Sequence, residues 1–179
     1  MKNRKRNRMS GFDYSSNNLY FITNCVKNNL CCFGNVIPVG TGRDLSVQHP
    51  DNNSQNIIMQ LNEYGAIVKN KIEWLELQYP YVAIHNYVIM PNHFHLILEI
   101  DSNKIKVKEV KIKSVSSLMG ALKTTTSKQI HNLGFVDFAW HRSFHDHIIR
   151  DEKQFFYITS YIDNNPQKWF QDKFFNALK

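Results

Sequence analysis

The sequence predicts an α+β fold in which helices pack on an antiparallel sheet, with a ferredoxin-like arrangement as the expected topology. Three observations predict it. Segments rich in aromatic and β-branched residues alternate with segments whose apolar residues recur every three or four positions. Their expected order is a strand-rich hairpin, a helix, two strands, a helix, a strand and a helix. The length of 179 residues, of which 42% are hydrophobic, suffices for one domain with one core.

The first elements expected along the chain are a hairpin and a loop. Residues 19–26 and 31–37 form the two expected strands, and a turn through Asn28 and Asn29 joins them. From about 38 to 56 the chain is rich in Gly, Pro, Asp, Asn, Ser and Gln and shows little periodicity. This composition indicates a surface loop insertion.

An amphipathic helix is predicted next, with Asn62 as its N-cap and a stop at Pro80. Its apolar residues recur at helical spacing: Leu61, Tyr64, Ile67, Val68, Ile72, Leu75 and Tyr79. Two strands follow, one on each side of Pro91-Asn92. One face of the first is expected to carry Val82, Ile84, Val88 and Met90, and one face of the second Phe94, Leu96, Leu98 and Ile100.

The rest of the chain predicts a helix, a strand and a final helix. Residues 115–132 show helical spacing, and residues 144–149 have the composition of a strand. The last helix is expected to begin at Asp151, which has capping-box spacing to the glutamine three residues later. It should end near Asn165, because Pro166 disfavours helical geometry in the residue before it.

Positive charge is in excess, since 22 Lys and Arg against 15 Asp and Glu give a net charge of +7. This excess favours a polyanionic partner, with nucleic acid as the first candidate. Residues 1–10 form an expected basic, flexible tail before a single domain of residues 11–179, and residues 104–113 hold a second lysine cluster. A solubilising tail and a solvated strand would give the same pattern.

Composition also excludes some classes of protein. No stretch approaches the roughly 20 apolar residues that span a bilayer, so a cytoplasmic protein without a membrane partner is expected. Cys25, Cys31 and Cys32 are odd in number and two of them are adjacent. They indicate neither a disulfide framework nor a zinc knuckle, and we interpret them as buried or incidental thiols.

The sharpest local feature is the His-Phe-His sequence of residues 93–95. Side chains alternate along a strand, so His93 and His95 should project from the same face. Such a pair can chelate one divalent cation and leave positions open for a substrate oxygen. A polar, half-exposed strand face is the alternative. A histidine-triad nucleotide hydrolase needs a third alternating histidine, and position 97 is Ile.

A second constellation lies on the last helix, where Tyr161 and Asn165 are four residues apart and share one face. Tyr157 lies one turn earlier. A tyrosine hydroxyl can act as a covalent nucleophile, but its free pKa of about 10 makes it weak without a nearby metal or base. Core packing of the tyrosine, with Asn165 as a helix stop, is the alternative.

Several segments together resemble the REP-associated tyrosine transposases and their insertion-sequence relatives. They are residues 87–95, Trp140, Arg142, residues 147–152 and residues 161–169, and the resemblance extends from about Gly11 to Trp169. It implies an HUH nuclease fold in which His93, His95 and Asn165 bind Mg or Mn and Tyr161 is the nucleophile. Tyr157 fits less well, because only Tyr161 occupies the tyrosine of the Tyr-Ile-x-x-Asn-Pro pattern.

The expected function is that of a metal-dependent single-stranded DNA transposase. It would nick and rejoin DNA through a 5′-phosphotyrosine intermediate, recognise DNA hairpins or palindromic repeats, and act as a homodimer. Ten basic residues are expected to contact DNA phosphates: Arg4, Lys5, Arg6, Lys104, Lys106, Lys108, Lys123, Lys128, Arg142 and Arg150.

Two rival functions stay open at this point. The first is a non-catalytic protein that binds DNA or RNA hairpins and keeps only a vestige of the metal site. The second is a metal-dependent phosphodiesterase that uses water, whose turnover would survive Tyr161→Phe without a covalent adduct.

Overall fold

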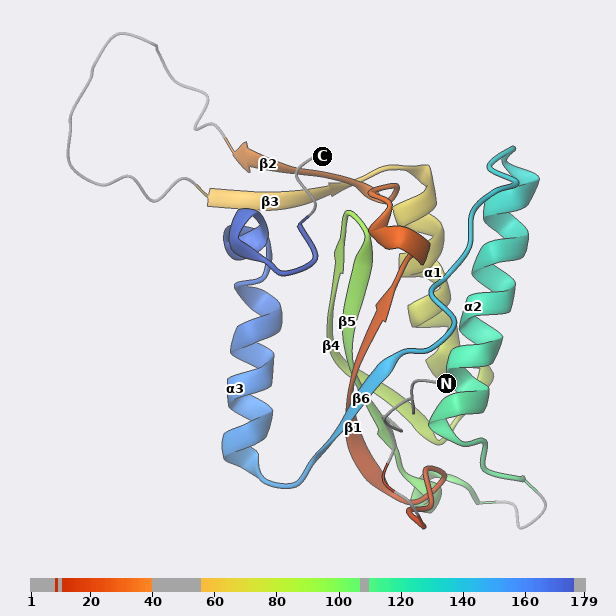
Figure 1. The fold of residues 1–179 in the computed structure, drawn as a ribbon. Coiled ribbons are helices and arrows are strands. Elements are labelled where there is room, and N and C mark those ends of the chain that lie inside the picture. The colour runs from red at the N-terminus through yellow and green to blue at the C-terminus, as the bar shows by residue number, and fades with distance from the viewer. Residues whose placement is uncertain (1–8, 10, 40–55, 107–109, 176–179) are drawn as a thin grey trace, which may run out of the picture.

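The structure, a computed structural model, describes residues 9, 11–39, 56–106 and 110–175. Its centre is a four-stranded antiparallel sheet with the strand order β4-β5-β1-β6 (Figure 1). The strands are β1 (Asn18–Cys25), β4 (Val82–Met90), β5 (His93–Ile100) and β6 (His145–Ile149). The expected α+β class is therefore confirmed.

Three α-helices cover the two faces of this sheet. The helices α1 (Glu63–Gln78) and α2 (Val115–Asn132) lie on one face, and α3 (Glu152–Asp163) lies on the other (Figure 1). The chain order β1-α1-β4-β5-α2-β6, with this strand order, is the ferredoxin-like arrangement.

The expected hairpin at the start of the chain is wrong. The strand β2 (Gly34–Val39) pairs with β3 (Asn56–Leu61) in a separate two-stranded sheet, and not with β1. The physical reason is that β5 and β6 already pair with both edges of β1. The turn is present, because Asn28 and Asn29 have φ of 58° and 53° and redirect the chain.

The expectation of a loop insertion at about 38–56 is wrong at both ends of this range. Pro38 and Val39 belong to β2, and Asn56 begins β3, while residues 40–55 lie outside the described residues. Most of the expected basic tail also lies outside them, since only Met9 of residues 1–10 is described.

The helix boundaries follow the expected caps. The Asn62 side chain accepts from the backbone N–H groups of Tyr64 and Gly65, both at 3.0 Å, and α1 ends at Gln78. The Asp151 carboxylate accepts from the backbone N–H of Gln154 at 2.8 Å at the start of α3. A 3-10 helix, η3 (Pro166–Gln171), follows α3. Among the described residues no helix is long and apolar enough to cross a membrane.

The predicted pairing of β4 with β5 is confirmed, but the predicted face of some β4 side chains is wrong. The register shifts between Ile84 and Asn86, so His85 lies at a bulge. Val88 is therefore opposite His95, on the face that α3 covers, whereas Ile84 is opposite Leu98 on the other face. The expectation that Val82, Ile84, Val88 and Met90 share one face was wrong, because a bulge reverses the alternation beyond it.

Because β5 is an inner strand, both of its faces are buried. The larger core lies between the sheet and the α1–α2 layer and contains the fully buried Phe94, Leu96 and Leu98. A smaller apolar cluster lies under α3 and contains Ile97, Ile149, Ile158 and Ile162. The polar side chains that project from β5 toward α3 therefore lie next to this apolar cluster.

Candidate active site and metal centre

The two histidines of β5 lie side by side on the face that α3 covers. Their Nε2 atoms are 3.2 Å apart, and 0% of His93 and 2% of His95 are exposed. The alternation expected from the sequence is confirmed, since Phe94 between them is buried in the opposite core. Two imidazole nitrogens this close are in position to bind one ion.

The Asn92 side chain fixes the orientation and tautomer of His93. Its Nδ2 donates to the carbonyl oxygens of Asn29 at 3.0 Å and Phe174 at 2.8 Å, so its Oδ1 can only accept. That Oδ1 lies 2.8 Å from His93 Nδ1, which must therefore carry the proton. The lone pair of His93 is then on Nε2, the atom that faces His95.

His95 is held from the neighbouring strand. Its Nδ1 lies 2.8 Å from the Thr23 hydroxyl, and its ring stacks on Phe21 with the ring centroids 5.4 Å apart. Burial, and after it the charge of Lys173, lower the pKa of His95 to about 3. Burial, His95 and Lys173 also hold the pKa of His93 well below its usual range. Both rings are therefore neutral at physiological pH, which is the form that binds metals.

Tyr161 reaches the histidine pair from α3. Its hydroxyl oxygen lies 3.2 Å from His95 Nε2, and its ring meets the Phe21 ring edge-on at 6.1 Å. Burial raises the pKa of Tyr161, the charge of Asp172 raises it further, and a hydrogen bond with Asn165 lowers it. The hydroxyl is therefore protonated at neutral pH and needs activation before it can attack.

Asn165 lies one turn after Tyr161 and is 1% exposed. Its Oδ1 is buried and has no hydrogen-bond partner among the described residues. An unsatisfied buried acceptor costs about 1–3 kcal/mol, so this oxygen needs a donor or a cation. A carbonyl oxygen is a ligand that Mg²⁺ and Mn²⁺ accept, and the orphaned atom therefore fits the expected role of Asn165.

Sequence reasoning missed one residue of the site, Asp172. A carboxylate oxygen of Asp172 and one nitrogen each of His93 and His95 all lie within 4.8 Å of one another. Asp172 follows η3, and its carboxylate accepts the backbone N–H of Phe174 at 2.8 Å. Phe174 in turn packs its ring on His93, with centroids 4.6 Å apart. No motif or spacing pointed to this aspartate, because the fold alone brings it to the histidines.

The basic residues expected to contact DNA differ in their surroundings. Lys104 pairs with Glu99 at 3.3 Å, while Lys106, Arg142 and Arg150 are exposed. Arg4, Lys5, Arg6 and Lys108 lie outside the described residues.

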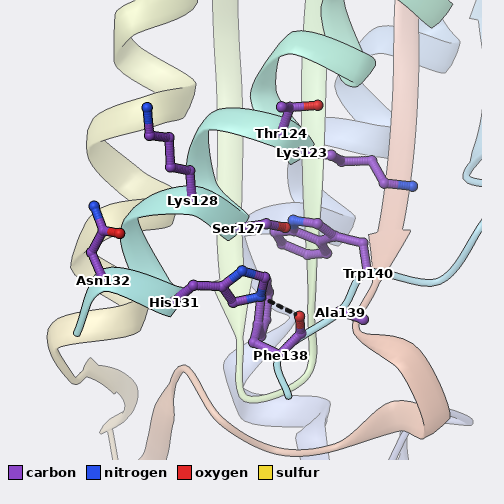
Figure 2. Close-up of a pocket in the computed structure, with 9 residues that line it drawn as sticks. All are labelled: Lys123, Thr124, Ser127, Lys128, His131, Asn132, Phe138, Ala139 and Trp140. Atoms are coloured by element: carbon purple, nitrogen blue, oxygen red, sulfur yellow. Dashed lines mark hydrogen bonds between the residues drawn. The ribbon is translucent and has the colours of Figure 1, made fainter. Parts of the chain in front are cut away.

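The two lysines of α2 line a shallow pocket of about 610 Å³ on the opposite helical layer (Figure 2). Its lining contains Lys123, Thr124, Ser127, Lys128, His131, Asn132, Phe138, Ala139 and Trp140. Lys123 differs from expectation, because its ammonium donates to the carbonyl oxygens of His141 at 2.7 Å and Arg142 at 3.2 Å. Burial also lowers the pKa of Lys123. Lys128 is exposed.

Comparison with known proteins gives a relative and a shared fold. No family model matches the sequence. A Haemophilus influenzae protein of undescribed function is 34% identical over 186 residues, which span 96% of this chain and 93% of that protein. The two belong to one family. A solved REP-associated tyrosine transposase, bound to a REP hairpin, superposes with a TM-score of 0.56 and 19% identity, over 95% of this chain and 77% of that one. The chain has the fold of this transposase.

The transposase fold accounts for how residues far apart in the sequence meet. The β5 strand brings the histidine pair, and α3 packs across the same face and brings Tyr161 and Asn165. The fold class expected from the sequence and from the resemblance is thereby confirmed.

Proposed function

We propose that the chain is a metal-dependent enzyme that nicks and rejoins single-stranded DNA, with Tyr161 as its nucleophile. One observation carries this proposal. The Tyr161 hydroxyl oxygen lies 3.2 Å from His95 Nε2, which itself lies 3.2 Å from His93 Nε2. A tyrosine is thus the side chain that meets a pair of neutral, metal-binding imidazoles.

The donor set fits a divalent cation such as Mg or Mn. His93 and His95 would hold it through nitrogen, and the orphaned Asn165 Oδ1 or the Asp172 carboxylate would supply oxygen. When bound, such an ion polarises a phosphate oxygen and leaves open positions for the substrate. The Asn165 role that the resemblance implies is part of this proposal, and Asp172 is the second candidate for the same position.

The reaction at Tyr161 follows from its surroundings. The hydroxyl proton passes to a base, for which the Asp172 carboxylate is the candidate, since one of its oxygens lies within 4.8 Å of a ring nitrogen of His95, the residue that the hydroxyl contacts. The Tyr161 oxygen then forms a bond to phosphorus, the bond from phosphorus to the 3′-oxygen breaks, and that oxygen takes up a proton. The products are a 5′-phosphotyrosine and a free 3′-hydroxyl.

The phosphotyrosine keeps the energy of the broken bond. The 3′-hydroxyl of a second DNA strand can attack the phosphotyrosine and release Tyr161. This step joins the two DNA strands without a nucleoside triphosphate. Excising a segment needs two cleavages and one chain offers one such tyrosine, so a homodimer is part of the proposal.

DNA hairpins are the substrate class that we propose, and the α2 pocket is a candidate contact for their phosphates (Figure 2). The lining includes two lysines, Lys123 and Lys128, together with several neutral side chains that can hydrogen-bond, and no carboxylate. The net charge of +7 supports a polyanionic partner.

The experiment that tests the proposal looks for a covalent adduct. Purified protein is mixed with labelled single-stranded DNA from the flanks of its own gene and with Mn²⁺, then denatured. An adduct that needs the metal and is lost in Tyr161→Phe and in His93→Ala is expected. Tight hairpin binding without any adduct would favour the non-catalytic binding protein, and DNA cleavage that survives Tyr161→Phe would favour the phosphodiesterase.

A further inference from the structure

The face of the sheet that carries the histidines is covered unevenly by α3. On one side α3 is fixed to β4, because Asp163 accepts from the Asn86 side chain at 2.8 Å and Phe155 meets the His85 ring at 5.7 Å. On this same face, His145 and His147 of β6 are exposed. The part of the face next to β6 is therefore open to solvent.

The opposite side of α3 faces this open part. Gln154 lies there, with its Oε1 3.3 Å from His147 Nε2 of β6, and Tyr161 lies there in contact with Phe21 of β1. Tyr157 lies three residues after Gln154 and four before Tyr161, so helical geometry places it on the same side of α3.

Tyr157 is 76% exposed, so its ring is accessible to a partner. On the sheet, the strand register places His147 opposite Phe21 and His145 opposite Thr23, on the face that α3 covers. Tyr157, His145, His147 and the half-buried Phe21 thus form one surface strip, which we call the β6-side strip. It begins next to the Tyr161 hydroxyl.

We propose that the β6-side strip binds the unpaired nucleotides beside the phosphate that Tyr161 attacks, and that Tyr157 stacks on one of their bases. This inference rests on the proposed function. Proteins that bind single strands present aromatic side chains as stacking platforms, and the preference for sequence is low because every base has a π-face. The exposed imidazoles of His145 and His147 beside the platform add polar groups that can contact phosphates or base edges.

The location of Tyr157 favours a nucleobase over other occupants. A DNA strand whose phosphate reaches the Tyr161 hydroxyl must continue along the surface beside Tyr161. Tyr157 lies one helical turn from Tyr161, about 6 Å along α3. A second exposed aromatic, Phe156, gives an internal comparison. It is 65% exposed, but helical geometry turns it by roughly 100° from Tyr157, away from the sheet.

The test measures binding without chemistry, on the Tyr161→Phe background. The probes are a labelled short oligothymidylate and an abasic oligomer of the same length, which carries the same phosphates without bases. Fluorescence anisotropy gives the affinity for each. We expect Tyr157→Ala to weaken oligothymidylate binding about tenfold and to leave abasic binding unchanged, whereas Tyr157→Phe and Phe156→Ala bind as the parent does.

Three results would overturn the inference: no loss in Tyr157→Ala, an equal loss for the abasic oligomer, or an equal loss in Phe156→Ala. Thermal unfolding checks that each variant is folded, and Tyr157→Leu replaces Tyr157→Ala should the latter unfold. The adduct assay with the unaltered chain separates this inference from the proposed function. An adduct without a Tyr157 effect overturns only the stacking, and a Tyr157 effect without an adduct overturns only the nuclease.

Discussion

Replacing Asn92 tests the claim that His93 is held ready to bind a metal. Asn92→Ala removes three hydrogen bonds of 2.8 to 3.0 Å from a side chain that is 0% exposed. At about 1 kcal/mol each, the loss in the free energy of unfolding is about 3 kcal/mol. For a chain of this size that lowers Tm by roughly 6–12 °C.

The same substitution should weaken metal binding. Without the Asn92 acceptor, His93 no longer has a fixed tautomer, and loss of such a partner typically lowers metal affinity about 10- to 100-fold. Isothermal titration with Mn²⁺ measures this, at a temperature where Asn92→Ala is folded. Asn92→Asp is the control, because the aspartate keeps an oxygen for His93 Nδ1 and loses only the amide donors. The Asn92→Asp variant should therefore bind Mn²⁺ more tightly than Asn92→Ala. Wild-type affinity in Asn92→Ala would refute the reasoning.

Three further predictions concern other parts of the molecule. Burial raises the pKa of Cys25 to about 11 and of Cys32 to about 12, so at pH 8 a thiol reagent followed by absorbance should modify the exposed Cys31 first and the other two slowly. Lys128→Ala should weaken DNA hairpin binding a few-fold and reduce the salt dependence of binding by about one phosphate contact, as titration at several salt concentrations would show. Asn62→Ala removes the N-cap of α1 and should lower the free energy of unfolding in urea by about 1–2 kcal/mol.

Local rules predicted the part of the site that a single strand builds. His93 and His95 share a face because side chains alternate along β5, and this holds whatever the rest of the chain does. The caps at Asn62 and Asp151 were likewise predicted, because a cap depends on residues within one turn.

What sequence reasoning missed depends on contacts between distant segments. The pairing of β2 with β3 follows from the occupied edges of β1, which no property of residues 31–37 reveals. The bulge at His85 and the approach of Asp172 to the histidines are of the same kind. The meeting of Tyr161 with His95 came from the family resemblance, since the spacing on α3 alone was equally typical of core packing.

The central claim, that Tyr161 is the nucleophile, is tested most directly by locating the DNA in the covalent adduct. Trypsin cleavage after Lys153 and Lys168 gives one peptide that contains both Tyr157 and Tyr161. Nuclease treatment shortens the attached DNA to a few nucleotides, which stay joined to the peptide through the 5′-phosphate. Tandem mass spectrometry then assigns the modified residue. We predict that the nucleotide is attached to Tyr161. A nucleotide attached to Tyr157, or to a residue outside this peptide, would contradict the proposed mechanism.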